Sequence, residues 1–175
     1  GYPGTWGQFT QSEGTAVADY GMDTDMTTDP TLRPKIAEGL KSLPVLSIVT
    51  DRDNLFSHEN DPQTGGIYIF TGPPVGDNTG HGWTRPASVE LWGPATELAD
   101  GQKWLGSLDL TTACGLRLHG GHGRLAEKNP KHSFRLVWKK QYGESSLKYP
   151  LYGDDEPAKF DQLVLRCHFG NSWQH

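Results

Sequence analysis

Residues 114–138 constrain the fold more than any other part of the chain, because they place a glycine-rich basic loop between two alternating segments. Before the loop, Leu116 and Leu118 alternate with polar residues, and after it Phe134 and Leu136 do the same. An apolar side chain at every second position indicates a half-buried β-strand. The sequence therefore predicts a β-hairpin whose connection forms a glycine-rich flap.

The flap combines flexible backbone with positive charge. Glycine lets the backbone adopt conformations that bring its amide groups close to an anion; the glycines concerned are Gly120, Gly121 and Gly123. Three cationic side chains lie in the loop or at its end: Arg124, Lys128 and Lys131. Amide groups and fixed cations together are typical of phosphate binding.

Two familiar phosphate-binding folds do not fit this loop. Residues 121–126 match G-x-G-x-x-G/A, but Pro130 follows and the next apolar period is two, whereas a dinucleotide-binding fold needs a helix there. A Walker loop needs Gly-Lys-Ser/Thr, which is absent here. A strand, a glycine flap and a strand that begins with a lysine form the layout that protein kinases place over ATP. A tight turn with solvated cations remains the alternative.

The rest of the chain predicts one α+β domain with a β-rich mixed or antiparallel sheet and few short helices. With 34% hydrophobic residues, 22 Gly and 12 Pro, we expect short strands and long loops. Residues 1–28 lack periodicity and predict an extended surface leader. Asp29 and Pro30 predict the start of a helix that ends at Leu43, and further strands are expected at residues 45–50, 67–70, 83–92 and 161–169.

Charge and hydropathy exclude two classes of partner. The net charge of −5 argues against a general nucleic-acid surface, which needs a basic face. No apolar run approaches the roughly 18 residues of a membrane span. Cys114 and Cys167 form a disulfide only if their strands are neighbours, and two cysteines leave the redox compartment open.

Eight blocks in a fixed order resemble the bacterial branch of the spore-coat protein H (CotH) kinase-like family. They are residues 18–23, 43–49, 54–56, 66–68, 83–90, 115–121, 130–136 and 148–153. The resemblance implies the N-lobe side of an atypical protein kinase fold, with residues 29–175 as the amino-terminal, incomplete part of the domain. It also implies a secreted or cell-surface bacterial protein that phosphorylates serine using ATP with Mg or Mn, in a larger chain with neighbouring domains.

The resemblance extends to particular site residues. The family's loop pattern falls on His119, Gly120, Gly121 and Arg124, and Gly123 stands where a serine is usual. Lys131 matches the strand lysine expected to neutralise the α- or β-phosphate. Arg117, Ser133 and Arg135 complete the expected ATP site, and strand alternation places Ser133 and Arg135 on the face of Lys131. Alternatively, Arg135 pairs with an acid across the sheet and Ser133 only packs.

The family's metal-binding acids and catalytic residues are expected beyond this chain, so the catalytic residues stay unknown and no metal ligand is assigned. Zinc is disfavoured, because no C-x-x-C or H-E-x-x-H accompanies His119, His122, His132, His168 and Cys167. Two hypotheses follow. The chain is the nucleotide-binding half of a CotH-type serine kinase, or it is a catalytically inactive kinase-like module of a surface or matrix protein.

Overall fold

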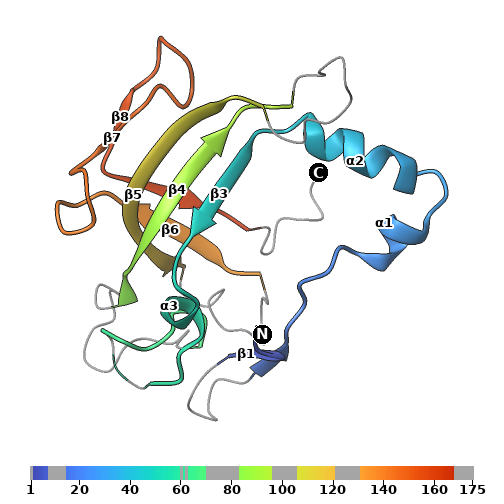
Figure 1. Ribbon diagram of the computed structural model, residues 1–175, viewed down its shortest axis with the longest axis horizontal. Helices are drawn as coiled ribbons and strands as arrows, with labels where there is room; N and C mark the ends of the chain where they lie inside the picture. The colour runs from blue at the N-terminus through green and yellow to red at the C-terminus, as the bar shows by residue number, and fades with distance from the viewer. Residues whose placement is uncertain are drawn as a thin grey trace. The chain divides into compact units, whose positions relative to one another are not determined.

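The computed structural model describes residues 2–7, 15–59, 61, 63–69, 83–95, 106–120 and 131–167. In these residues the fold is α+β, as predicted, and its main feature is a five-stranded antiparallel sheet (Figure 1). The strands are β3 (Val45–Val49), β4 (Arg85–Trp92), β5 (Leu108–His119), β6 (Ser133–Val137) and β9 (Gln162–Leu165), and they lie in the order β3-β4-β5-β6-β9.

The remaining elements are short. Two further strand pairs join β1 (Thr5–Gly7) to β2 (Thr15–Val17) and β7 (Leu147–Lys148) to β8 (Lys159–Phe160). The helices are α1 (Thr24–Thr28), α2 (Arg33–Lys41) and α3 (Arg52–Phe56). None of the helices in the described ranges is long and apolar enough to cross a membrane.

The chain divides into two compact units, one made of Gly1–Asp19, Thr50–Ala87 and Ala113–His175 and the other of Tyr20–Val49 and Ser88–Thr112. The first unit contains most of the buried apolar side chains. Leu116 and Leu136 face each other across β5 and β6, and both are almost fully buried. Ile67, Ile69 and Trp138 are also buried in this unit. The apolar positions that predicted the hairpin therefore supply part of its core.

The second unit contains α2, which begins later than the sequence predicted. The Oδ1 atom of Asp29 accepts the backbone N–H groups of Thr31 and Leu32 at 2.6 and 2.9 Å. Both bonds lower the pKa of Asp29, and the bond from Leu32 has the larger effect. Residues 30–32 form a turn, so the helix starts at Arg33 and has a proline in its first turn. Asp29 caps this turn and not the helix itself.

Strand β3 also differs from its prediction. The apolar run at residues 45–50 indicated a buried strand, but among the residues that the structure describes β3 pairs only with β4 and forms an edge of the sheet. Its last residue, Val49, is 62% exposed. An apolar run of this length does not distinguish a central strand from an edge strand, because both use β-branched residues.

The predicted strand at residues 67–70 is a buried turn over the part that the structure describes. The N–H groups of Ile67 and Tyr68 bond to the carbonyl oxygens of Asn54 and Leu55 in α3, at 2.9 and 2.8 Å. Ile69 bonds within the turn, to the carbonyl of Gly66. The backbone groups that a strand would use for pairing are therefore used by the helix and by the turn itself.

Candidate functional site

The β5–β6 hairpin gathers four of the predicted site residues on one face of the sheet. In the antiparallel register Arg117 lies opposite Arg135, and His119 lies opposite Ser133. Side chains two residues apart on a strand share a face, so these four lie on the face opposite to Leu116 and Leu136. The predicted hairpin is thus confirmed in its pairing, and its polar face carries two guanidinium groups side by side.

The flap itself is described only at its first residue. Gly120 has a φ of +110°, in the left-handed region that favours glycine. Residues 121–130 lie outside the described part of the chain, and with them Gly121, Gly123 and Arg124. Glycine is therefore required where the chain leaves β5, and the phosphate-binding role of the flap stays a prediction.

Arg135 is held within the polar face by neutral groups. Its Nε and Nη2 atoms lie 3.2 and 2.7 Å from Nδ1 of His119, and Nη1 donates to Oε1 of Gln162 at 2.8 Å. Because a guanidinium only donates, Nδ1 of His119 is the acceptor and the ring proton belongs on Nε2. Arg135 therefore does have partners across the sheet, but these two are a histidine and an amide rather than an acid.

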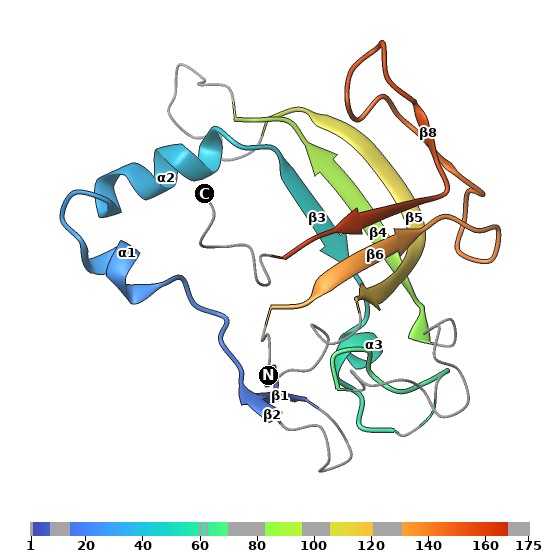
Figure 2. The same cartoon turned by 180° about the vertical axis from the view of Figure 1, so that it is seen from behind.

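Ser133 connects β6 to the end of β9. Its Oγ atom accepts the backbone N–H of Cys167 at 3.0 Å and lies 3.1 Å from the Sγ atom of the same residue. Figure 2 shows β6 and β9 side by side, as their register requires. The hydroxyl thus has a structural role, because it connects the two strands.

Lys131 lines an open pocket at the flap end of β6, which we name the flap-end pocket. This pocket has a volume of about 340 Å³ and is lined by Tyr68, Lys131, His132, Phe134, Leu165, Arg166 and Cys167. The ring of Tyr68 stacks on His132 with centroids 4.6 Å apart and lies 5.9 Å from the ring of Phe134. The pocket therefore joins an aromatic wall to two cationic side chains.

The flap-end pocket lies on the other side of the sheet from the polar face. Its strand residues, Phe134 and Leu165, alternate with Ser133 and Arg135 along paired strands. Lys131 lines this pocket together with Phe134 and Leu165, and its sharing a face with Ser133 and Arg135 stays a prediction. Strand geometry begins only at Ser133, so the alternation does not extend back to Lys131.

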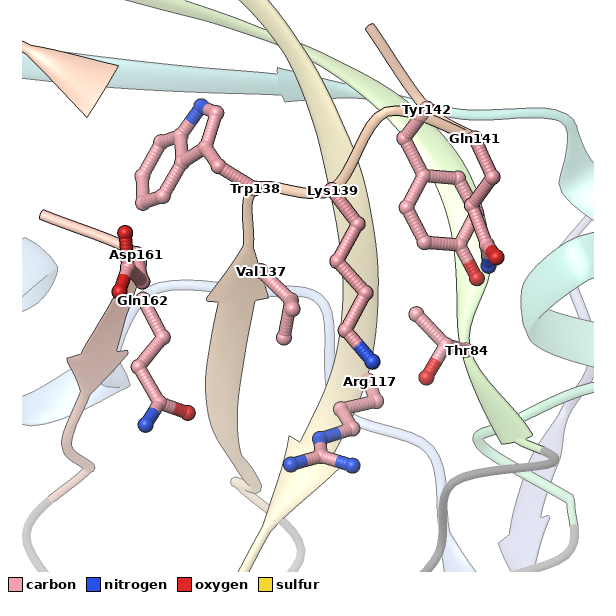
Figure 3. Close-up of a pocket in the computed structure, with 9 residues that line it drawn as sticks. All are labelled: Thr84, Arg117, Val137, Trp138, Lys139, Gln141, Tyr142, Asp161 and Gln162. Carbon is pink, nitrogen blue, oxygen red and sulfur yellow. The ribbon is translucent and has the colours of Figure 1, made fainter. Parts of the chain in front are cut away.

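Arg117 lines a second pocket, which we name the Arg117 pocket, at the opposite end of β6. It has a volume of about 270 Å³ and is lined by Thr84, Arg117, Val137, Trp138, Lys139, Gln141, Tyr142, Asp161 and Gln162 (Figure 3). Arg117 and Lys131, predicted to serve one ATP site, thus line different pockets. Sequence reasoning missed Lys139 and Tyr142, which lie beyond the strand where alternation gives no guidance.

Gly115 allows one wall of the Arg117 pocket to form. A Cβ atom at this position would lie 2.5 Å from Cε2 of Tyr142 and 2.6 Å from Cγ2 of Thr84. Both distances are shorter than real contacts, so the tyrosine ring packs against β5 only because residue 115 has no side chain. A glycine inside a predicted strand is a known signal of such close approach, and it was the available clue to this pocket.

Metal binding has no support in the described residues. Within the ranges that the structure describes, no three His, Cys, Asp or Glu side chains come together in a way that could hold a metal ion. His122 and His168 lie outside those ranges.

The two cysteines are free thiols in the structure. Cys114 precedes Gly115, which pairs with Val137, whereas Cys167 contacts Ser133 at the other end of β6. Four residues of extended strand span about 13 Å at about 3.3 Å each. A disulfide requires Cα atoms within roughly 7 Å, so this fold keeps the two thiols apart.

We expect the two thiols to react at very different rates with a thiol reagent at neutral pH. Burial raises the pKa of Cys114 to about 11, and its side chain is 0% exposed. The nucleophilic thiolate is then scarce and shielded. Cys167 is half-buried and faces an open pocket. Mass spectrometry of native protein should show one fast modification, lost in Cys167→Ser. Fast labelling of Cys114 would contradict its burial.

Comparison with known proteins finds no similarity that assigns this chain to a family. No protein-family model, no curated protein and no solved structure matches it.

Proposed function

We propose that this chain is the nucleotide-binding, amino-terminal part of a CotH-type protein kinase domain, corresponding to the N-lobe side of that fold. In the complete protein, the domain would transfer phosphate from ATP to serine in secreted or surface proteins. The observation that carries the proposal is the flap-end pocket, where Lys131 and Arg166 stand beside an aromatic wall at the base of the glycine flap.

Each part of this pocket suits a part of a nucleotide. The rings of Tyr68 and Phe134 and the side chain of Leu165 offer an apolar surface on which a base can stack. Lys131 is exposed and carries a compact charge that suits phosphate without demanding one orientation. The residue that begins the flap, Gly120, has the left-handed conformation that a backbone folding over phosphates often needs.

The divalent metal of the proposed reaction finds no ligand group in the described residues. Mg or Mn would supply charge neutralisation between the phosphates, and its protein ligands are expected outside this chain. Here the residues of the chain only bind and orient the nucleotide. A secreted or cell-surface location and a serine-containing protein substrate belong to the same proposal.

Replacement of Lys131 by alanine is expected to weaken ATP binding by about 1–3 kcal/mol, because one charge-assisted contact to phosphate is lost. Isothermal titration calorimetry with ATP and Mg or Mn measures the change. Lys148→Ala serves as a matched control, since Lys148 is an exposed lysine on β7 that lines neither pocket.

Equal affinity of the wild type and Lys131→Ala would contradict the assignment of the flap-end pocket. Failure of the wild type to bind ATP at all would favour the alternative, a kinase-like module that binds no nucleotide.

A second substitution, Phe134→Ala, separates the two parts of the pocket. It should weaken the binding of adenosine as well as that of ATP, whereas Lys131→Ala should weaken the binding of ATP alone.

A further inference from the structure

We propose that the Arg117 pocket binds a phosphate monoester carried by a serine side chain of a peptide. It is a second anion site, distinct from the flap-end pocket, and the inference does not depend on ATP binding there. Three features of the pocket carry it: two cations that converge, a size that suits a side chain, and acceptor groups at the opposite end.

The cations come from two segments of the chain. Arg117 belongs to β5, and Lys139 follows β6. Figure 3 shows the Lys139 ammonium and the Arg117 guanidinium in the same part of the pocket, with the Thr84 hydroxyl beside them. An oxyanion bound between two cationic side chains is attracted by both of them.

Arg135 adds to the positive potential without competing for the ligand. It lies directly opposite Arg117 in the strand register. Its guanidinium donates to His119 and Gln162, which are both neutral acceptors. Two arginines in this register beside a lysine raise the positive potential at the pocket, which favours binding of a doubly charged oxyanion.

The size of the pocket selects a small group. Its volume of about 270 Å³ lies just below the range of roughly 300–1,000 Å³ that is usual for drug-sized ligands and cofactors. Val137, Trp138 and Tyr142 form its apolar and aromatic walls. A phosphorylated serine side chain fits these limits.

The far end of the pocket accepts hydrogen bonds. Asp161 and Gln162 lie on the other side of Val137 from Lys139 and Arg117 (Figure 3). The Asp161 carboxylate repels further negative charge and accepts N–H donors. A phosphoserine within a peptide offers both groups, phosphate at one end and backbone amides at the other. This polarity favours a peptide over a free anion.

Backbone hydrogen bonds hold the two ends in place. The N–H of Trp138 donates to the carbonyl of Asp161 at 2.9 Å, and the N–H of Tyr142 donates to the carbonyl of Lys139 at 2.9 Å. The first bond fixes the acceptor end against the strand, and the second closes the turn that carries Lys139. The site is therefore formed by ordered backbone as well as by side chains, which lowers the entropy cost of binding.

The test is the binding of a short phosphoserine peptide, compared with its unphosphorylated form, inorganic phosphate and ATP. Lys139→Gln should weaken binding of the phosphopeptide about tenfold or more, because a hydrogen bond to a charged group is lost. Lys140→Gln is the matched control, because Lys140 is the next residue, is also exposed and does not line the pocket. Because Lys139 is exposed, its replacement should leave the fold intact, and circular dichroism verifies this.

Preferential binding of the phosphopeptide, weakened by Lys139→Gln and unchanged by Lys140→Gln and Lys131→Ala, would support the proposal. Equal affinity for the phosphopeptide and inorganic phosphate would overturn the peptide assignment. Equal affinity for both peptides would overturn the anion site. If ATP competes with the phosphopeptide and Lys139→Gln abolishes this competition, the pocket is a nucleotide site and the proposal is overturned. Loss of ATP binding in Lys131→Ala alone bears only on the flap-end pocket.

Discussion

Replacement of Leu136 by alanine is expected to lower the free energy of unfolding by about 2–5 kcal/mol, the usual range for removal of a buried leucine side chain. Leu136 is 1% exposed and lies on β6 between Leu116 on β5 and Leu163 on β9. Neighbours on both sides belong to paired strands, which cannot move inward without breaking backbone hydrogen bonds. The cavity would therefore stay largely open, and the cost should be near the upper part of the range.

Urea unfolding followed by tryptophan fluorescence measures this effect. Val164→Ala is the comparison, because Val164 lies on the adjacent strand β9 but is 38% exposed and on the polar face. We expect it to cost less than about 1 kcal/mol, the span of strand preferences. Similar losses for the two variants would show that Leu136 does not belong to the core of this unit.

Replacement of Arg85 by alanine is the second large expected effect. Arg85 is 3% exposed, its Nη2 atom donates to the carbonyl of Gly65, and its guanidinium lies 5.8 Å from the ring centroid of Trp83. Burial lowers the pKa of Arg85 from its ordinary value, yet an arginine stays charged at any pH used for a protein. Loss of a hydrogen bond from a buried charge costs about 1.5–3 kcal/mol, and lost packing adds to this.

The position of the lost bond makes the effect local as well as global. Gly65 precedes the buried turn that carries Ile67, Tyr68 and Ile69, and Tyr68 forms a wall of the flap-end pocket. Arg85→Ala should therefore increase amide hydrogen exchange at residues 65–69 beyond the global loss of stability. Arg85→Met keeps most of the packing and isolates the hydrogen bond. Arg52→Ala, at an exposed position on α3, should change stability by less than about 0.5 kcal/mol.

Local pattern was sufficient for the elements whose neighbours are close in sequence. Alternation at Leu116 and Leu136 predicted two strands joined as a hairpin, and the two strands do pair in antiparallel register. Asp29 was predicted to start the helix, but its side chain caps a turn of three residues that precedes α2.

Pattern failed where distant backbone groups decided the conformation. Ile67 and Tyr68 have strand-like side chains, but the carbonyl groups of α3 lie within reach and capture their N–H groups. The alternation of side chains along β6 does not extend to Lys131, because the strand begins two residues later. Neither outcome depends on the local composition, so no window of sequence could have shown it.

The sequence by itself determined the hairpin, the polar character of one of its faces and the need for glycine at residue 120, because strand period and backbone sterics act between neighbours in the chain. Only the tertiary structure decided which cations share a pocket. Arg117 and Lys139 meet through the pairing of β5 with β6 and the turn beyond it, and Lys131 lies elsewhere. Contacts between side chains far apart in sequence depend on register and on where each strand ends, which composition does not encode.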